Sequence, residues 1–338
     1  MTEKEGMRPR VAVIGTGAIS QIVHVPILAE REDVDLAVLA DADEAKARTV
    51  AERFDVPEVL DPESALRRED LDAVVLCTPA YAHEQLAVAA LEAGMALFVE
   101  RPIALDGDGA ERIVAAARES GAPLVVGLPH RFRPEVVALR SFVAGGELGD
   151  PYAVRGSWLT RKVPAGRPSW RHDPTRGGGA MMDLGVSALD LCLWLVGYPE
   201  ITRVTAVMHR SEFEVEDAAT LMMESAAGVV FTLEVSSRYY AGEDRYFARV
   251  MGADGSGSLP PLEIYRKLGG RPLDVTPRQP RPRGGENLYM NAYRRLLDHF
   301  IRVVAGSAEA PLPDQQVALM RVIDGAYRSD RERREVPL

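Results

Sequence analysis

A glycine-rich stretch near the amino terminus has the residue types and spacing of a dinucleotide-binding turn. Residues Gly15–Ser20 read GTGAIS and lie between a short apolar run, typical of a strand, and a helical pattern. Gly15 permits a tight turn, Gly17 lets the backbone approach a pyrophosphate, and free N–H groups at the start of the next helix can bind the phosphate charge. Ser20 replaces a third glycine and is still small enough for close helix–strand packing. The turn therefore predicts cofactor contacts from Gly15, Gly17, Ala18 and Ile19, with an ordinary turn as the alternative.

A carboxylate follows this turn at the distance that dinucleotide-binding folds require. Asp41 ends the second apolar run, about 20 residues after the glycines. A carboxylate here can accept hydrogen bonds from a ribose 2′-hydroxyl and repel a 2′-phosphate, so it favours NAD over NADP. The first basic side chain after it is Lys46. Capping of the next helix is the alternative for an acid here, and it suits Asp43 better than Asp41.

A second candidate site is a basic segment at residues 161–179. It carries five cations against one acid, Asp173, in a chain that is acidic overall. Arginine side chains can hold carboxylate or phosphate groups through paired hydrogen bonds, which favours an anionic sugar-derived substrate. Trp170 can stack on a sugar ring or anchor the loop, and a solvated loop or a subunit contact is the alternative for the segment. The cations are Arg161, Lys162, Arg167, Arg171 and Arg176.

Three further side chains could handle a proton or a hydroxyl group. Tyr152 lies near the basic segment and His172 lies within it. His130 follows the last strand of the first domain, where the chain is expected to enter the cleft between the domains. A packed, hydrogen-bonded histidine is the alternative for His130. No cluster of side chains has metal-ligand spacing, so we expect no metal.

Composition limits the classes of protein that these sites can belong to. The chain has 338 residues, a net charge of −10, 46% hydrophobic and 27% charged residues. These values are typical of a globular protein of two domains and argue against disorder and nucleic-acid binding. The apolar run before Gly15 is too short for a membrane span, and both cysteines, Cys77 and Cys192, lie in apolar stretches. We expect a cytoplasmic protein.

The first part of the chain alternates short apolar runs with helical patterns. Strands are predicted at Val11–Ile14, Leu36–Ala40, Glu58–Leu60, Ala73–Cys77, Ala96–Val99 and Leu124–Val126. Helices are predicted at Glu44–Phe54, Ala82–Ala93 and Gly109–Glu119. Nearly continuous apolar strands separated by helices are typical of a doubly wound parallel sheet, so residues 1–128 are predicted to form a Rossmann domain.

The rest of the chain, residues 129–338, predicts an α/β domain with an open, largely antiparallel sheet. Strands are expected at Tyr152–Leu159, Thr202–His209, Ala218–Glu224, Val229–Ser236 and Tyr246–Gly252. Helices are expected at Pro134–Ala144, Ala180–Val196, Tyr289–Val304 and Asp314–Ser329. Gly269–Gly285, rich in proline and arginine, is expected to be a loop.

Several motifs in order resemble the glucose-fructose oxidoreductase, inositol dehydrogenase and MocA family. Besides Gly15–Ser20 with the following HVP, they are Cys77-Thr78-Pro79 with His83, Glu100-Arg101-Pro102, Gly177–Asp183, and the carboxyl-terminal Asp324–Val336. The resemblance implies NAD(P)-linked hydride transfer on sugars or related polyols. It also implies homodimers or homotetramers formed through the carboxyl-terminal sheet. Carried over by position, it adds Thr78, Pro79, His83 and Glu100 to the cofactor-binding residues.

The chain departs from this family at both proton-handling positions. Members of this type have a lysine between the glutamate and proline, where this chain has Arg101, and a histidine four residues after the aspartate, where it has Ser187. Arginine stays protonated, so Arg101 can orient or polarise a substrate oxygen but is a poor proton carrier. Ser187 can only hydrogen-bond, or it has no function. Asp183, or else His130, is left as the candidate base.

These residues support one leading function and two alternatives. The leading one is an oxidoreductase with an unusual proton relay. Its catalytic candidates are Arg101, Asp183, His130 and Ser187, and its substrate-binding candidates are Arg101, Tyr152, Trp170, Arg171, His172 and Asp183. A cofactor-binding sensor or partner subunit without redox turnover is the first alternative. NAD-assisted elimination or isomerisation is the second.

Overall fold

The computed structural model describes residues 8–162, 169–278 and 287–338. Within them the chain forms two compact units. The first consists of residues up to 104, 108–128 and 289–314, and the second of residues 105–107, 129–288 and 315–338 where described. The chain passes to the second unit after Leu128, and residues 289–314 belong to the first unit.

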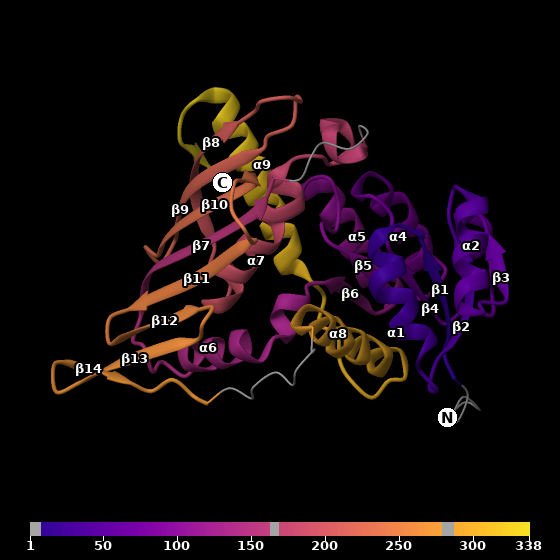
Figure 1. Ribbon diagram of the computed structural model, residues 1–338, viewed down its shortest axis with the longest axis horizontal. Helices are drawn as coiled ribbons and strands as arrows, with labels where there is room; N and C mark the ends of the chain where they lie inside the picture. The colour runs from indigo at the N-terminus through magenta and orange to yellow at the C-terminus, as the bar shows by residue number, and fades with distance from the viewer. Residues whose placement is uncertain (1–7, 163–168, 279–286) are drawn as a thin grey trace. The chain divides into compact units, whose positions relative to one another are not determined.

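The first unit is built on a six-stranded parallel sheet (Figure 1). Its strands are β1 (Arg10–Ile14), β2 (Asp35–Ala40), β3 (Glu58–Leu60), β4 (Ala73–Leu76), β5 (Ala96–Glu100) and β6 (Leu124–Gly127), in the order β3-β2-β1-β4-β5-β6. Every residue of β4, β5 and β6 is buried, so both faces of the sheet are covered. The predicted doubly wound fold is confirmed.

The helices of the first unit are α1 (Val25–Ala29), α2 (Glu44–Phe54), α3 (Pro62–Leu66), α4 (His83–Glu92), α5 (Gly107–Ser120) and α8 (Leu288–Val304). Four of them, α2, α4, α5 and α8, begin and end near the expected residues, whereas α3 was not predicted. Asp43 caps α2 by accepting a hydrogen bond from Lys46 N, as predicted. The helix after the glycine turn differs from expectation, because it opens with a π-helical turn, η1 (Ser20–His24), before α1. A short 3₁₀ turn, η2 (Ala80–Ala82), precedes α4.

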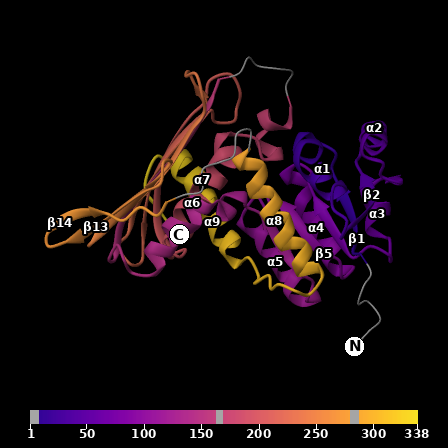
Figure 2. The same cartoon turned by 60° about the horizontal axis from the view of Figure 1, so that its bottom comes forward.

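The second unit contains a nine-stranded, mostly antiparallel sheet, as predicted. Its strands are β7 (Pro151–Arg161), β8 (Ile201–His209), β9 (Ala218–Ser225), β10 (Val230–Tyr239), β11 (Arg245–Gly252), β12 (Gly255–Leu259), β13 (Glu263–Leu268), β14 (Arg271–Asp274) and β15 (Val336–Pro337). Buried and exposed residues alternate along β8, β9 and β10. One face is therefore covered, by α6 (Pro134–Ala144), α7 (Val186–Leu195) and α9 (Asp314–Glu332), and the other is open (Figure 2).

One sequence expectation for this unit was wrong. The expected loop from Gly269 contains β14, which pairs with β13 in a hairpin that projects from the sheet (Figure 2). Gly269 and Gly270 both have positive φ angles, 57° and 78°, as a two-residue hairpin turn requires. Residues 275–278 of that expected loop form no helix or strand, and residues 279–285 lie outside the described residues. The expected helix from Ala180 is present, and its first turn is a π-helical turn, η6 (Met181–Gly185), which leads into α7.

The apolar stretch that contains η6 and α7 is a core element. Among the described residues, Pro174–Leu195 is the helical stretch long and apolar enough to span a membrane, and 89% of its most apolar window is buried inside the protein. Packing against the sheet therefore accounts for its composition. Cys192 on this helix and Cys77 after β4 are buried, free thiols, as predicted.

Candidate nucleotide and substrate sites

The glycine turn lies where the strand order of the first sheet reverses, between β1 and β4. Gly15 has a φ of +96°, and a Cβ atom there would lie 2.7 Å from the carbonyl carbon of Cys77, at the end of β4. Only glycine fits this approach of two backbones. The turn is thus held at the carboxyl ends of two neighbouring strands, where open α/β sheets bind ligands.

The outer side of this turn is open. A Cβ atom built on Gly17 would meet no atom within 4 Å, Ala18 is exposed, and Ile19 is half-buried. Beside the turn, the hydroxyl of Thr78 is buried and has no hydrogen-bond partner among the described residues. An open backbone groove and an unused hydroxyl suit the pyrophosphate of a dinucleotide, so the residues present fit this cofactor. Pro79, which follows, precedes η2.

Asp41 is held in place by the turn itself. Its Oδ2 accepts hydrogen bonds from Thr16 N at 2.7 Å and Thr16 Oγ1 at 2.8 Å, and Lys46 Nζ lies 2.8 Å away. Its Oδ1 accepts one from Asp43 N. Burial alone raises the pKa of Asp41, but these partners outweigh it and lower the pKa below its usual value. Asp41 is therefore a fixed anion next to the glycine turn. Thr16, which holds Asp41 in place, was not among the residues predicted from the sequence, although its position between two glycines was a signal for it.

Arg101 follows a buried carboxylate. Glu100, at the end of β5, accepts a hydrogen bond from His24 Nε2 at 2.7 Å and one from Arg101 N at 3.2 Å, and it also hydrogen-bonds Tyr293. Burial raises the pKa of Glu100, but the hydrogen bond and attraction from His24 and the Arg101 charge lower it below the usual value. Glu100 is 6% exposed and accepts the Arg101 N–H, so it supports the 100–101 backbone, and its expected contact with the cofactor stays a prediction.

His83 connects the two loops that carry the family motifs of this unit. Its Nδ1 lies 2.8 Å from the carbonyl oxygen of Pro102, and its Nε2 lies 2.7 Å from that of Thr78. The ring is 1% exposed, and burial lowers the pKa of His83. Its position beneath both loops indicates that it orients them.

In the second unit, Asp183 lies in η6, half-buried, with its Oδ2 3.6 Å from Arg171 Nε. The Arg171 guanidinium in turn lies over the ring of Trp170, 4.5 Å from its centroid. These three candidate substrate-binding residues are thus brought together by the structure. Trp170 and His172 belong to a 3₁₀ turn, η4 (Trp170–His172), that precedes the glycine triplet.

The other candidates of this unit are placed differently. Ser187 is 5% exposed in α7, which favours an inner helix position without a direct substrate contact. The ring of His130 is buried edge-on against Trp158, with centroids 4.8 Å apart, which favours packing over proton transfer. Tyr152 is exposed at the start of β7, about 30 Å along the strand from Arg161 where the basic segment begins. The structure therefore does not bring Tyr152 to that segment.

Nearby carboxylates offset the surplus of positive charge that the sequence predicted for the basic segment. Each described cation faces a carboxylate of the same unit: Arg161 faces Asp244, Lys162 faces Glu212, Arg171 faces Asp183, and Arg176 faces Asp173. Asp173 belongs to the segment itself and Asp183 follows it in η6, whereas Asp244 and Glu212 come from loops that are distant in the sequence. Arg167 lies outside the described residues.

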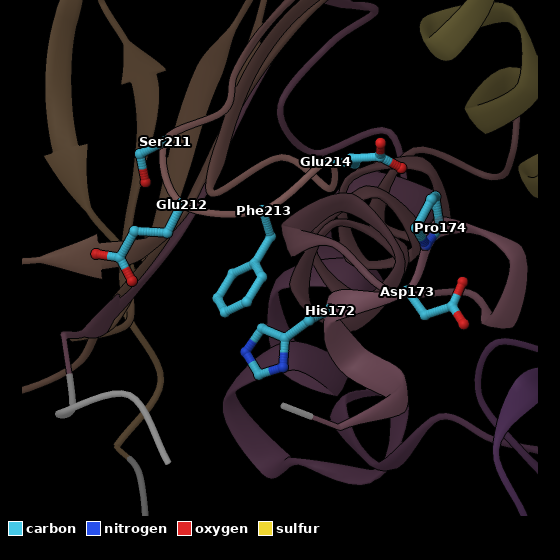
Figure 3. Close-up of a pocket in the computed structure, with 7 residues that line it drawn as sticks. All are labelled: His172, Asp173, Pro174, Ser211, Glu212, Phe213 and Glu214. Carbon is cyan, nitrogen blue, oxygen red and sulfur yellow. The ribbon is translucent and has the colours of Figure 1, made fainter. Parts of the chain in front are cut away.

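A hollow of about 500 Å³ lies beside this segment (Figure 3). Both His172 and Phe213 line it, and their rings are in contact, with centroids 4.1 Å apart and planes tilted by 37°. The loop between β8 and β9 supplies Phe213 and the carboxylates Glu212 and Glu214. No group of three or more metal-ligating side chains occurs among the described residues. The hollow can offer ring stacking and hydrogen-bond acceptors.

Comparisons with known proteins agree with these features. Residues 9–128 match the model of an oxidoreductase family with an NAD-binding Rossmann fold, and residues 136–258 match the GFO/IDH/MocA C-terminal domain. The chain is 27% identical to D-glucoside 3-dehydrogenase of Escherichia coli (strain K12), over 95% of each protein. It is also 27% identical to inositol 2-dehydrogenase of Rhizobium meliloti (strain 1021), over 98% of this chain and 100% of that protein. The crystal structure of GenD2 from gentamicin A biosynthesis, in complex with NAD, is similar with a TM-score of 0.83 and 29% identity, covering 98% of this chain and 96% of that one.

Proposed function

Since the chain belongs to the Gfo/Idh/MocA family of oxidoreductases, we propose that it is an NAD-dependent dehydrogenase or reductase of a sugar or polyol. The observation that carries this proposal is the glycine turn at the strand-order switch, open on its outer side and flanked by the fixed carboxylate of Asp41. When bound, NAD supplies the hydride acceptor or donor.

The residues of the first unit would hold the cofactor. The backbone from Gly15 to Ile19 and the hydroxyl of Thr78 would bind the pyrophosphate, and Asp41 would accept the ribose hydroxyls. Two features favour NAD over NADP. Asp41 is held ionised by its hydrogen bonds, and Asp43 adds a second negative charge, against the single cation Lys46.

Arg101 and Asp183 would have different roles in the reaction. Arg101 would stabilise negative charge on the reacting oxygen, because its guanidinium remains charged at all working pH values. Asp183 would accept or return the proton, since Ser187 and His130 are buried in packed positions. A fixed cation suits reduction of a carbonyl in particular, because alkoxide charge develops in that direction.

The substrate class follows from the charge balance of the second unit. Because each described cation of the basic segment is paired, an uncharged sugar is a better match than an anionic one. Trp170 and Arg171 would contact it next to Asp183. The relatives' names, a glucoside dehydrogenase and an inositol dehydrogenase, support neutral polyhydroxylated substrates for this chain too.

The open face of the nine-stranded sheet would join copies of the chain. Val207 and Met222 on this face are 71% and 54% exposed, and Thr205 and Thr232 flank Met222 in register. Exposed apolar side chains on a broad sheet face are typical of subunit contacts. We expect a homodimer or homotetramer in a reducing, cytoplasmic setting, and light scattering on Met222→Lys should show a smaller assembly than on the natural chain.

Binding and turnover can be tested separately. We expect the purified protein to quench or shift NADH fluorescence on binding, more tightly than NADPH, and to change nicotinamide absorbance with members of a neutral sugar and polyol panel. Gly17→Ala should keep the fold, because its Cβ meets nothing, yet weaken NADH binding about tenfold by filling the groove. Gly242→Ala, whose Cβ is equally unobstructed, is the matched control and should bind NADH normally.

Two outcomes would contradict this function. Equal NADH affinity in Gly17→Ala and the natural chain would place the nucleotide elsewhere. Tight NADH binding without turnover on any sugar, polyol or keto substrate would favour a sensor or partner subunit, the reading that the replaced lysine and histidine also allow.

A further inference from the structure

We propose that Glu216 is the positioning residue for Asp183, holding the backbone segment 179–183 in its active arrangement. The catalytic part of this inference rests on the proposed function, whereas the anchoring itself does not. Glu216 precedes β9, at the end of the β8–β9 loop, and lies 35 residues from the amide that it binds. No motif in the sequence singles it out.

The contacts of Glu216 converge on the start of η6. Its Oε1 accepts a hydrogen bond from Met181 N at 2.8 Å, and its backbone carbonyl accepts one from Ala180 N at 2.9 Å. The Tyr327 hydroxyl, from α9, donates to the same Oε1 at 3.0 Å. One residue therefore satisfies two of the amides that a helix start leaves unpaired, and it does so at 3% exposure, away from water.

The glycine triplet is shaped by the same contact. A Cβ atom on Gly179 would lie 2.3 Å from Glu216 Oε1, and one on Gly178 would lie 2.4 Å from the Arg171 carbonyl oxygen. Gly177 and Gly179 have φ angles of +78° and +112°. The triplet is thus packed between η4 on one side and Glu216 on the other, so the two flanking elements determine where the chain enters η6.

This placement bears directly on Asp183. Asp183 lies two residues after Met181, and its backbone N–H donates to the Gly179 carbonyl at 3.0 Å. A shift of the segment moves the Asp183 carboxylate relative to anything bound beside it. Misplacement of a reacting group by about 1 Å can reduce the rate by roughly 100-fold.

The anchoring needs an acceptor oxygen at position 216 and not a particular charge. Both partners of Oε1 are neutral donors, Met181 N and the Tyr327 hydroxyl. Glutamine retains such an oxygen with nearly the same volume, whereas alanine leaves both donors unpaired. The pair of substitutions therefore separates loss of the acceptor from loss of the carboxylate.

The experiment compares full-length variants by three measurements. Hydrogen exchange followed by mass spectrometry reports on amides of residues 180–187, steady-state kinetics gives kcat and KM, and fluorescence titration gives the NADH dissociation constant. Glu216→Ala should speed exchange of this peptide about tenfold and lower kcat roughly 10- to 100-fold, with NADH affinity unchanged. Glu216→Gln should have an exchange rate and a kcat close to those of the natural chain. Tyr327→Phe, which removes one donor and keeps the ring, should give values between those of the natural chain and Glu216→Ala.

Asp330→Ala is the matched control. Asp330 also lies on α9, accepts a hydrogen bond from a β8 amide, Met208 N, at 2.8 Å, and pairs with Arg210. Neither of these two partners belongs to residues 179–183. We expect it to lose stability without faster exchange at 180–187 and without loss of kcat. If Glu216→Ala does not fold, Tyr327→Phe and Glu216→Gln carry the test.

The outcomes are decisive in each case. Unchanged exchange at 180–187 in Glu216→Ala and Tyr327→Phe, or equal changes in Asp330→Ala, would overturn the anchoring. Faster exchange with unchanged kcat would overturn the link to Asp183. If the natural chain turns over no substrate, the proposed function fails, and the exchange data alone decide whether Glu216 anchors this segment.

Discussion

Each unit contains one buried glutamate that supports a candidate catalytic segment, and the two differ in their partners. Glu100 is surrounded by His24, Tyr293 and the charge of Arg101, and its pKa is lowered. Glu216 is held mainly by Met181 N and the Tyr327 hydroxyl, and burial raises its pKa. Burial disfavours the anion at both sites, and the Arg210 charge also lowers the pKa of Glu216. The two pKa values shift in opposite directions because the partners of Glu100 outweigh burial, whereas those of Glu216 do not.

The largest loss of stability is expected when the histidine partner of Glu100 is removed. His24→Ala leaves the Glu100 carboxylate buried without its main donor, and we expect the free energy of unfolding to fall by about 3 kcal/mol. Chemical denaturation measures this loss. His209→Ala, which truncates an exposed histidine, should change it by less than about 0.5 kcal/mol. Equal losses in the two variants would show that the buried pair contributes nothing.

Gly15 in the first unit and Gly179 in the second both have positive φ angles but lie against different kinds of neighbour. Gly15→Ala meets backbone atoms of Cys77 and Thr78, whereas Gly179→Ala meets the side chain of Glu216, which can rotate. We expect both to destabilise by about 1–3 kcal/mol, Gly15→Ala more, because backbone yields less than a side chain. In Gly179→Ala combined with Glu216→Ala the clash is gone, so the double variant should lose less than the two single losses added. Strict additivity, measured by denaturation, would contradict the contact.

Stability as a function of pH should separate the two glutamates by sign. For Glu100, with a lowered pKa, the stabilisation is present above the ordinary value of 4.5 and is lost as the pH falls through the folded-state pKa. For Glu216, with a raised pKa, it is present below 4.5 and is lost as the pH rises through the folded-state pKa. The free energy of unfolding of Glu100→Gln, relative to the natural chain, should therefore be highest in acid. That of Glu216→Gln should be highest at higher pH. Parallel curves from denaturation at several pH values would refute this.

Half-exposed ion pairs should matter least for stability. Arg171 and Asp183 are 54% and 39% exposed and 3.6 Å apart, so Arg171→Gln should change the free energy of unfolding by less than about 0.5 kcal/mol. It should nevertheless raise KM for the sugar while leaving NADH affinity unchanged. Arg176→Gln breaks a pair of similar distance and exposure, 3.4 Å with 55% and 40%, and should affect KM less. The same KM in both variants would remove Arg171 from the proposed sugar contacts.

The success of sequence reasoning differed between the units for a physical reason. In the first unit, predicted strands such as Glu58–Leu60 and the helix Glu44–Phe54 have the observed bounds, because local apolar patterns and caps determine them. In the second, the β13–β14 hairpin was missed, since its charged and proline-containing strands carry no alternating pattern. The charge balance of the basic segment was also missed, because Asp244 and Glu212 come from other strands and loops.

Residue types alone were enough to predict the doubly wound sheet and the glycine turn with Asp41 at its side, while the replacement of the family lysine and histidine by Arg101 and Ser187 stays a prediction. Those features depend on residue type and on neighbours close in the chain. The tertiary structure alone decided that Thr16 secures Asp41, that His24 and Tyr293 surround Glu100, and that Glu216 meets the start of η6. The hydrogen bonds Thr16–Asp41, Met181–Glu216 and His24–Glu100 join residues 25, 35 and 76 positions apart. Only the folded chain therefore brings their donors and acceptors within hydrogen-bond distance.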